Sequence, residues 1–315
     1  WLTRPRTATE VPRAMSCVAE AARFGSDIQL GHVRIGASKV LLSSPTWLSV
    51  ALAGLQPIVP GHTVVAPRRL GAVRFCELPE PEMLDLWRTA RSTQALLEPH
   101  YGATASNWAV FDGAAAGQPL PHAHLHVVPR RPGDFAENDQ VYELMERWSP
   151  LPLVPATSAA GPTEWPGDDE RRPRSGEDMA SEASSYRAAL PAEGGAAAAF
   201  PEEQAFAKIR IPGSNVFFAS ETGLTVAFVN LKPLVPGHVL VTPRRVVPRI
   251  GQLTDEEFDD LFRSVRIVQA LVESVHGAQA SRLGIQDGKD AGQSVPHIHV
   301  HILPMPATPA VASVL

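Results

Sequence analysis

Two short arrays place three histidines each at every second position of the chain. The stretches are "PLPHAHLHVVP" at 119–129, with His122, His124 and His126, and "SVPHIHVHILP" at 294–304, with His297, His299 and His301. Alternate side chains of an extended strand share one face, about 6.6 Å apart. Each array therefore predicts a wall of three imidazoles, while the apolar residues between them enter a core.

Three interpretations fit such a wall. Imidazoles bind zinc, copper or iron. Alternatively, one imidazole acts as a nucleophile while its neighbours orient it and hold charge. The third interpretation is a set of buried histidines satisfied by the backbone. Three histidines in register, present twice and each preceded by a glycine-containing stretch, disfavour that third interpretation.

The stretch before the second array, "IQDGKDAGQSVPH", favours a phosphate over a metal. Gln286, Gln293 and Ser294 offer amide and hydroxyl donors. Gly288 and Gly292 let a ligand approach the backbone closely. Donors without neighbouring carboxylate acceptors suit a phosphate group. The two carboxylates nearby, Asp287 and Asp290, are interpreted as turn residues.

The chain contains an internal repeat. "LSVALAGLQPIVPGHTVVAPRR" at 48–69 matches "LTVAFVNLKPLVPGHVLVTPRR" at 224–245 without a gap, at an offset of 176 residues. The two histidine arrays are offset by 175 residues, in the same order. Two blocks that match in order and distance indicate a duplication.

Each repeat has the pattern of an α+β unit. "GLTVAFVNL" alternates and is rich in β-branched residues, "VPGH" forms a turn, and "VLVTP" is a second strand. A helix follows, with Thr254 as its N-cap, Glu257 completing a capping box and Gly277 at its end. The first repeat has its partner helix within 78–102, and two further strands follow each helix. The predicted fold class is α+β, with two domains that each have an antiparallel sheet and one main helix.

The predicted domain boundaries follow the composition. Residues 1–22 are a disordered leader, 23–149 the first domain, 150–202 a Pro/Gly/Ala/Glu-rich linker, 203–308 the second domain and 309–315 a tail. Within the linker, "GEDMASEASSYRAAL" has the composition of a short helix, for which we expect no packed role. The alternative for the leader is the end of a transit peptide.

The chain resembles the histidine triad superfamily, in particular its fragile histidine triad branch of dinucleoside triphosphate hydrolases. "GQSVPHIHVHILP" matches the pattern His-φ-His-φ-His-φ-φ, in which φ is apolar. "FVNLKPLVPGHVLVTP", "IQDGKDAGQSV" and "PRRPGDFAENDQVYEL" extend the resemblance to about 24–148 and 204–306. The Gly-Gly-Arg and Trp-Pro-Pro-Gly signatures typical of the phosphoramidase branch do not follow the triad, so the alternative of a nucleoside phosphoramidase is disfavoured.

The resemblance implies a mechanism. His299 attacks the α-phosphorus of a diadenosine polyphosphate, forms a nucleotidyl-histidine, and water releases AMP. His238, His297 and His301 orient His299 and balance charge. The residues that bind substrate are Gln286 and Gln293 at the phosphate oxygens, Ser294 at the leaving group and Asn230 at the ribose. The base occupies an apolar slot that includes Ile209 and Leu240. Mg²⁺ or Mn²⁺ enters with the substrate phosphates, and no metal site within the protein is expected.

The two copies differ in their polar residues. The first repeat keeps the histidines and the glutamine, namely His62, His122, His124, His126 and Gln118. It has Gly54, Phe111 and Pro119 in place of Asn230, Gln286 and Ser294. This loss of donors predicts a degenerate first site.

Only the first repeat has the segment 130–144 that resembles the loop after the triad, including Tyr142. Proteins of the resembled branch are homodimers, so the duplication predicts an intramolecular pseudo-dimer in a monomeric chain. We also expect the first repeat to add surface to the second site.

Composition narrows the partners. A formal net charge of −5 gives no global basic field for nucleic acid or an anionic membrane. No apolar run reaches the roughly 18 residues of a membrane span. A nucleotide is the expected ligand, and the expected location is cytoplasmic, or organellar if the leader is part of a transit peptide. A sensor that binds dinucleotides and turns over slowly remains the alternative from the class of binding proteins.

Overall fold

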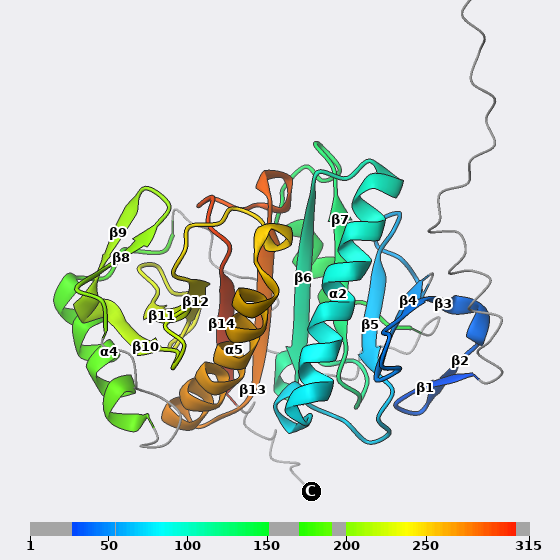
Figure 1. The fold of residues 1–315 in the computed structure, drawn as a ribbon, viewed down its shortest axis with the longest axis horizontal. Coiled ribbons are helices and arrows are strands. Elements are labelled where there is room, and N and C mark those ends of the chain that lie inside the picture. The colour runs from blue at the N-terminus through cyan, green and yellow to red at the C-terminus, as the bar shows by residue number, and fades with distance from the viewer. Residues whose placement is uncertain (1–26, 54, 151–169, 191–199, 307–315) are drawn as a thin grey trace, which may run out of the picture.

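The computed structural model describes residues 27–53, 55–150, 170–190 and 200–306 (Figure 1). Both halves of the chain share one ten-stranded sheet whose order is β10-β11-β12-β14-β13-β6-β7-β5-β4-β3. Its first-repeat strands are β3 (Val40–Ser43), β4 (Ser49–Ala53), β5 (Thr63–Pro67), β6 (Ala105–Asp112) and β7 (Leu125–Arg130). Its second-repeat strands are β10 (Val216–Ala219), β11 (Thr225–Val229), β12 (Val239–Pro243), β13 (Ala278–Asp287) and β14 (Val300–Pro306). Every neighbouring pair is antiparallel.

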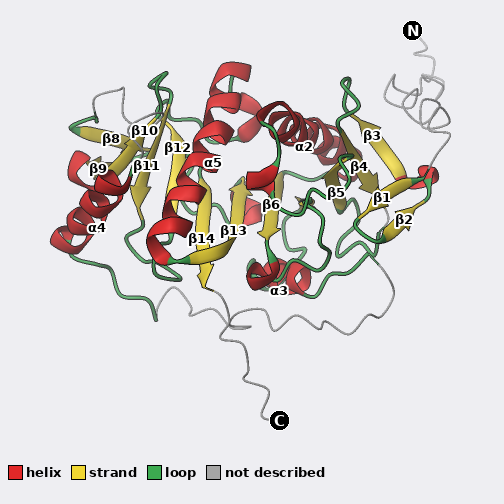
Figure 2. Ribbon diagram, turned by 90° about the horizontal axis from the view of Figure 1, so that it is seen from below, coloured by secondary structure: helices red, strands yellow, loops and turns green. Residues whose placement is uncertain are grey.

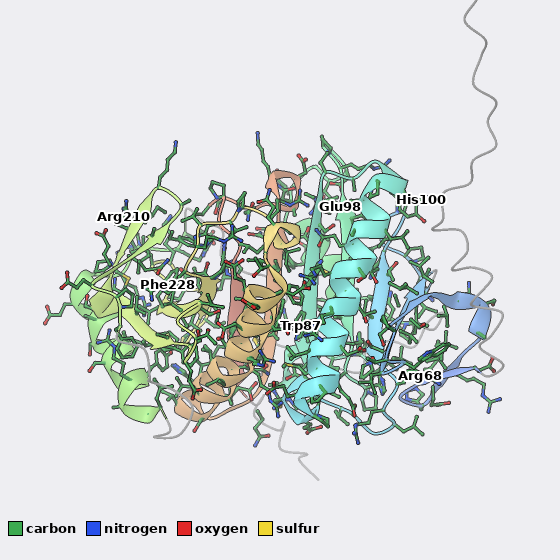
Figure 3. The ribbon with its side chains drawn as sticks, viewed as in Figure 1. Arg68, Trp87, Glu98, His100, Arg210 and Phe228 are labelled. Carbon is green, nitrogen blue, oxygen red and sulfur yellow. The ribbon has the colours of Figure 1, made fainter. Side chains whose placement is uncertain are left out.

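Helices α2 (Glu80–Tyr101) and α5 (Asp255–His276) lie side by side on one face of this sheet (Figures 1 and 2). Trp87 of α2 stacks on Phe262 of α5 with ring centroids 4.1 Å apart, so the two helices share a core (Figure 3). The predicted capping box at the start of α5 is present, and Gly277 ends the helix in the left-handed region at φ 61°. Aromatic pairing and burial of both helices make the two repeats one hydrophobic unit.

The repeats meet at the pairing of β6 with β13. Ala109 lies opposite Gly284 in this ladder, and these residues are 175 positions apart, the offset of the two arrays. A position that pairs with its own copy marks an approximate two-fold axis. The predicted intramolecular pseudo-dimer is therefore confirmed.

Partly buried ion pairs cross this axis symmetrically. Arg249 contacts Asp287 of its own repeat at 2.9 Å and Glu98 of the other repeat at 2.7 Å. Arg74 likewise reaches Glu273 across the axis at 2.6 Å. Asp287 is fully buried and also accepts from Gln94 Nε2 of the other repeat. It is therefore an interface residue, and its interpretation as a turn residue was wrong, because sequence spacing does not reveal a partner far away in the chain.

Two hairpins flank the ends of the sheet, β1 (Ile28–Leu30) with β2 (Val33–Ile35) and β8 (Glu203–Phe206) with β9 (Ile209–Pro212). Helix α3 (Gln140–Glu146) lies on the face of the sheet away from α2 and α5 (Figure 2). None of the helices among the described residues is long and apolar enough to cross a membrane.

Part of the predicted linker is a packed helix, α4 (Gly176–Ala189). Ala183 and Tyr186 are buried, and Arg187 donates from Nε to the carbonyl of Val216 at 2.9 Å. The prediction of a linker without a packed role was wrong for 170–190, because Met179, Ala183 and Tyr186 form a helical stripe that composition alone conceals. The leader 1–22, the tail 309–315 and the linker residues 151–169 and 191–199 lie outside the described residues.

Candidate active site

The second array lines one wall, as predicted. Ile298, Val300 and Ile302 are fully buried in the core beneath α5. Strand β14 begins only at Val300, so His297 and His299 precede it in extended chain. The backbone there is bound by the loop after β12, since the amide of Ile298 donates to the carbonyl of Val247 at 2.6 Å. The alternation of faces survives because the chain stays extended.

The ring of His299 is oriented by a single hydrogen bond. Its Nδ1 lies 2.7 Å from the carbonyl oxygen of His297, which only accepts, so Nδ1 carries the proton. The lone pair on Nε2 is then available to attack an electrophile. Burial lowers the pKa of His299, although its hydrogen bond to the carbonyl of His297 acts in the opposite direction. The neutral, nucleophilic form is therefore favoured near neutral pH.

His238 and His301 form a second hydrogen-bonded unit. The amide of Leu234 donates to His238 Nδ1 at 3.1 Å, so the proton of neutral His238 is on Nε2. Its Nε2 lies 2.9 Å from His301 Nδ1 and donates to it. His301 must then carry its own proton on Nε2. The pKa of His238 is lowered to about 3, chiefly by burial and secondly by the positive charge of Arg171. The low pKa keeps the ring neutral.

His297 is held at the other end of the array. Its Nε2 donates to the carbonyl of Pro243 at 2.9 Å, and Thr242 Oγ1 lies 3.1 Å away. Burial lowers its pKa to about 4. This arrangement places the carbonyl of His297 where it can orient His299, so His297 acts through its backbone as well as its ring.

An apolar cluster lies beside the rings, lined by β8, β9, β11 and β12. Phe206 lies 5.1 Å from His299 and 5.4 Å from His297 between ring centroids. Leu240 belongs to this cluster with Phe228 and partly buried Ile211. Ile209 is 49% exposed, and its place in the slot stays a prediction. Ile209 and Ile211 lie two residues apart on β9, so they are on the same face of the strand.

The predicted phosphate donors lie at the end of β13 and in the loop that leads to the array. Ser294 is exposed, and Gln286 and Gln293 are partly exposed. The Nε2 of Gln293 donates to the carbonyl of Pro248 at 2.9 Å. Gly292 has φ +89°, and a Cβ there would lie 2.9 Å from Gln286 Nε2. Glycine is required at this position for two reasons. Its φ angle is positive, and the side-chain amide of Gln286 lies too close to leave room for a Cβ atom.

The first array has the same internal hydrogen bonds. His124 Nδ1 lies 2.7 Å from the carbonyl of His122, and His62 Nε2 lies 2.9 Å from His126 Nδ1. Burial lowers the pKa of His124 to about 4 and that of His62 to about 3. Gln118 caps the array through its amide, which lies 3.1 Å from the carbonyl of His122. The framework of imidazoles is thus equal in the two repeats.

The surroundings of the first array are closed. Trp148 packs its indole against His62, His124 and His126, with ring centroids 6.0, 5.7 and 4.8 Å away. Phe111 lies 5.9 Å from His126. His124 Nε2 is buried and makes no hydrogen bond within the described part of the chain. Sequence reasoning missed Trp148, which follows the triad by more than twenty residues. Gly54 lies outside the described residues.

The segment after the first triad reaches the second site. The hydroxyl of Tyr142 lies 3.2 Å from Asn107 Nδ2. It also hydrogen-bonds the side chain of Gln286 in the other repeat. Asn107 also donates to the carbonyl of Ala291 at 3.0 Å. The first repeat therefore contacts the glycine-containing loop of the second, and its contribution of surface to the second site stays a prediction.

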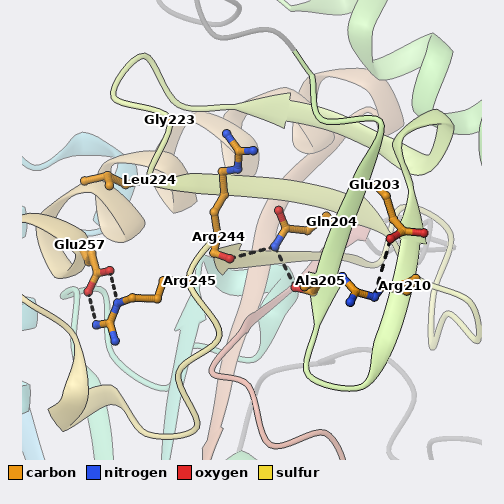
Figure 4. A pocket seen from close by; sticks show the side chains of 9 residues that line it. All are labelled: Glu203, Gln204, Ala205, Arg210, Gly223, Leu224, Arg244, Arg245 and Glu257. Carbon is orange, nitrogen blue, oxygen red and sulfur yellow. Dashed lines mark hydrogen bonds and ion pairs between the residues drawn. The ribbon is translucent and has the colours of Figure 1, made fainter.

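A separate hollow of about 550 Å³ opens at the β8–β9 hairpin (Figure 4). Its lining includes Gln204, Arg210, Arg244 and the paired Arg245 and Glu257, but no histidine. Across the described ranges, no group of three or more His, Cys, Asp or Glu side chains is arranged to hold a metal ion. Several imidazole nitrogens hydrogen-bond to carbonyls or to one another.

The sequence profile of the HIT domain matches residues 38–133 and 214–307. The chain belongs to the HIT domain family. The *Arabidopsis thaliana* protein named bifunctional bis(5'-adenosyl)-triphosphatase/adenylylsulfatase FHIT is 34% identical over 58% of this chain and 94% of its own length. The *Schizosaccharomyces pombe* asymmetrical bis(5'-nucleosyl)-tetraphosphatase is 58% identical over 33% of this chain. The *Dictyostelium discoideum* bis(5'-adenosyl)-triphosphatase is 50% identical over 29% of this chain. The matched region spans 56% of the length of the Schizosaccharomyces pombe relative and 60% of the length of the Dictyostelium discoideum relative. This HIT chain therefore matches just over half of each of these two proteins.

Proposed function

We propose that the second HIT repeat hydrolyses dinucleoside polyphosphates, with diadenosine triphosphate giving AMP and ADP. The observation that carries this proposal is the ring of His299, whose Nδ1 is fixed on the carbonyl of His297 while Nε2 keeps its lone pair. The relatives named bis(5'-adenosyl)-triphosphatases support the same class of substrate.

In the proposed reaction, His299 Nε2 bonds to the α-phosphorus as the bond from that phosphorus to the bridging oxygen breaks. ADP leaves with the electron pair, near the hydroxyl of Ser294. Water then attacks the same phosphorus, the P–N bond breaks, one proton passes to solvent and AMP departs. His301 donates from Nε2 to a phosphate oxygen, since its Nδ1 accepts from His238.

The remaining assignments support binding. Asn230 binds ribose, Gln286 and Gln293 bind phosphate oxygens, and the base lies against Phe206. Mg²⁺ or Mn²⁺ enters on the polyphosphate, because divalent cations of this kind are commonly bound through substrate phosphates. The name of the *Arabidopsis* relative makes adenylyl sulfate a second candidate substrate, since it shares the AMP half.

The test compares the purified chain with His299→Ala and His124→Ala on diadenosine tri- and tetraphosphate and adenylyl sulfate, with products separated by chromatography. We expect AMP release to be lost only in His299→Ala. Reaction in H₂¹⁸O should place the label in AMP rather than in ADP. Equal partial loss in both variants would contradict a single working site, and tight binding without turnover would favour a slow-turnover sensor.

A further inference from the structure

Arg174 precedes α4 and binds the loop after β11 in the second repeat. Its amide donates to the carbonyl of Leu231 at 3.0 Å. Its Nε and Nη2 both donate to the carbonyl of Asn230, at 3.1 and 2.5 Å. Glu182, nearly two turns into α4, pairs with Nη1 of the same guanidinium. A planar guanidinium bound on several sides fixes its partners in position as well as in charge.

This loop carries Asn230, the residue predicted to bind ribose. It also lies next to the hydrogen-bonded pair of His238 and His301. Asn230 Oδ1 accepts from the amide of Lys232 at 2.9 Å, and the amide of Leu234, farther along the same loop, donates to His238 Nδ1 at 3.1 Å. His238 passes its hydrogen bond to His301 at 2.9 Å. A displacement of the loop would therefore move the amide of Asn230 and release the ring of His238.

The equivalent loop of the first repeat is bound by a different residue. This residue is Trp148, which like Arg174 follows the first histidine array in the chain. Leu55 corresponds to Leu231 at the offset of 176, and its carbonyl accepts from Trp148 Nε1 at 2.8 Å. There the partner is an indole that covers the histidines. At the second loop the partner is Arg174, whose guanidinium donates to the backbone carbonyl of Asn230.

We propose that Arg174 is a positioning residue for the second site: it fixes the loop of Asn230 and, through it, the hydrogen bond between His238 and His301. The proposal deepens the function proposed above and rests on it. Arg174 acts from outside both repeats, so the second repeat by itself lacks this support.

The test is Arg174→Ala in the full chain, with Arg187→Ala as the matched control. Arg187 also binds α4 to the second repeat through backbone carbonyls, those of Gly213 and Val216, but it does not contact residues 230–232. We expect kcat/KM for diadenosine triphosphate to fall at least about tenfold in Arg174→Ala and to stay within about twofold in Arg187→Ala. Added guanidinium ion at non-denaturing concentration should restore activity to Arg174→Ala alone.

A readout independent of turnover separates this proposal from the proposed function. Ring ¹⁵N resonances should show His238 and His301 in single tautomers in the parent chain and in Arg187→Ala. We expect tautomer averaging in Arg174→Ala. Unchanged tautomers in Arg174→Ala, or equal activities in the two variants, would overturn the positioning role. A parent chain that releases no AMP, together with the expected ring spectra, would instead overturn the proposed function.

Discussion

The indole of Trp148 stands edge-on to the imidazole of His126, with ring centroids 4.8 Å apart and planes at 83°. Its Nε1 is satisfied by the carbonyl of Leu55, so this contact is a packed and hydrogen-bonded one. The first repeat thus keeps every histidine of the array. The side chain of Trp148, which follows the array in the chain, covers these histidines.

Replacing Trp148 with Ala should destabilise the chain without creating a second active site. Truncating a buried aromatic side chain costs about 3–5 kcal/mol of unfolding free energy. Denaturant unfolding measures that loss. Gly54, Phe111 and Pro119 still replace the donors, so Trp148→Ala combined with His299→Ala should release no AMP. Release that depends on His124 would show that Trp148 alone silences the first site.

Gly292→Ala and Gly117→Ala form a matched pair at equivalent positions. Their φ angles are +89° and +88°, so an L side chain should cost each about the same, roughly 1–2 kcal/mol. Only at Gly292 would the new Cβ press on Gln286 Nε2. We expect similar losses of stability, measured by urea unfolding, and a loss of kcat/KM in Gly292→Ala alone. Comparable activity in both variants would remove Gln286 from the site.

The rate of the first chemical step should persist into acid. Burial lowers the pKa of His299, and only its unprotonated Nε2 can attack phosphorus. The rate should therefore decline only as the pH falls below the ordinary histidine value of about 6.5. Single-turnover formation of the nucleotidyl-enzyme, followed by rapid quench, measures this step apart from product release. A midpoint above that value would contradict a nucleophile kept neutral by burial.

The stability of the chain should fall as the pH drops below about 6.5. Both arrays and their partners have lowered pKa values, chiefly through burial: His62, His122, His124, His126, His238, His297, His299 and His301. Below that pH the unfolded chain binds protons that the folded chain refuses, so each such ring removes up to about 1.4 kcal/mol per pH unit.

Urea unfolding between pH 7 and 5 checks this dependence. His124→Asn should reduce the slope by the share of one ring. A flat profile would mean that the folded chain accepts these protons.

Local patterns foretold much of the second site. The His-φ-His spacing placed the rings on one wall, and Thr254 with Glu257 marked the start of α5. Asp287 was misassigned as a turn residue. One of its partners, Gln94, lies in the other repeat, 193 residues away in the chain.

The sequence by itself determined the duplication, the fold class, the two imidazole arrays and the loss of donors in the first repeat. Repeat offsets and alternation are local properties of the chain, and they need no coordinates. Only the tertiary structure decided that Trp148 covers the first array, that Tyr142 and Asn107 support the loop of the other repeat, and that Arg174 binds the loop of Asn230. These contacts join residues far apart in the chain, and their geometry follows from how the sheet and helices pack around the two-fold axis.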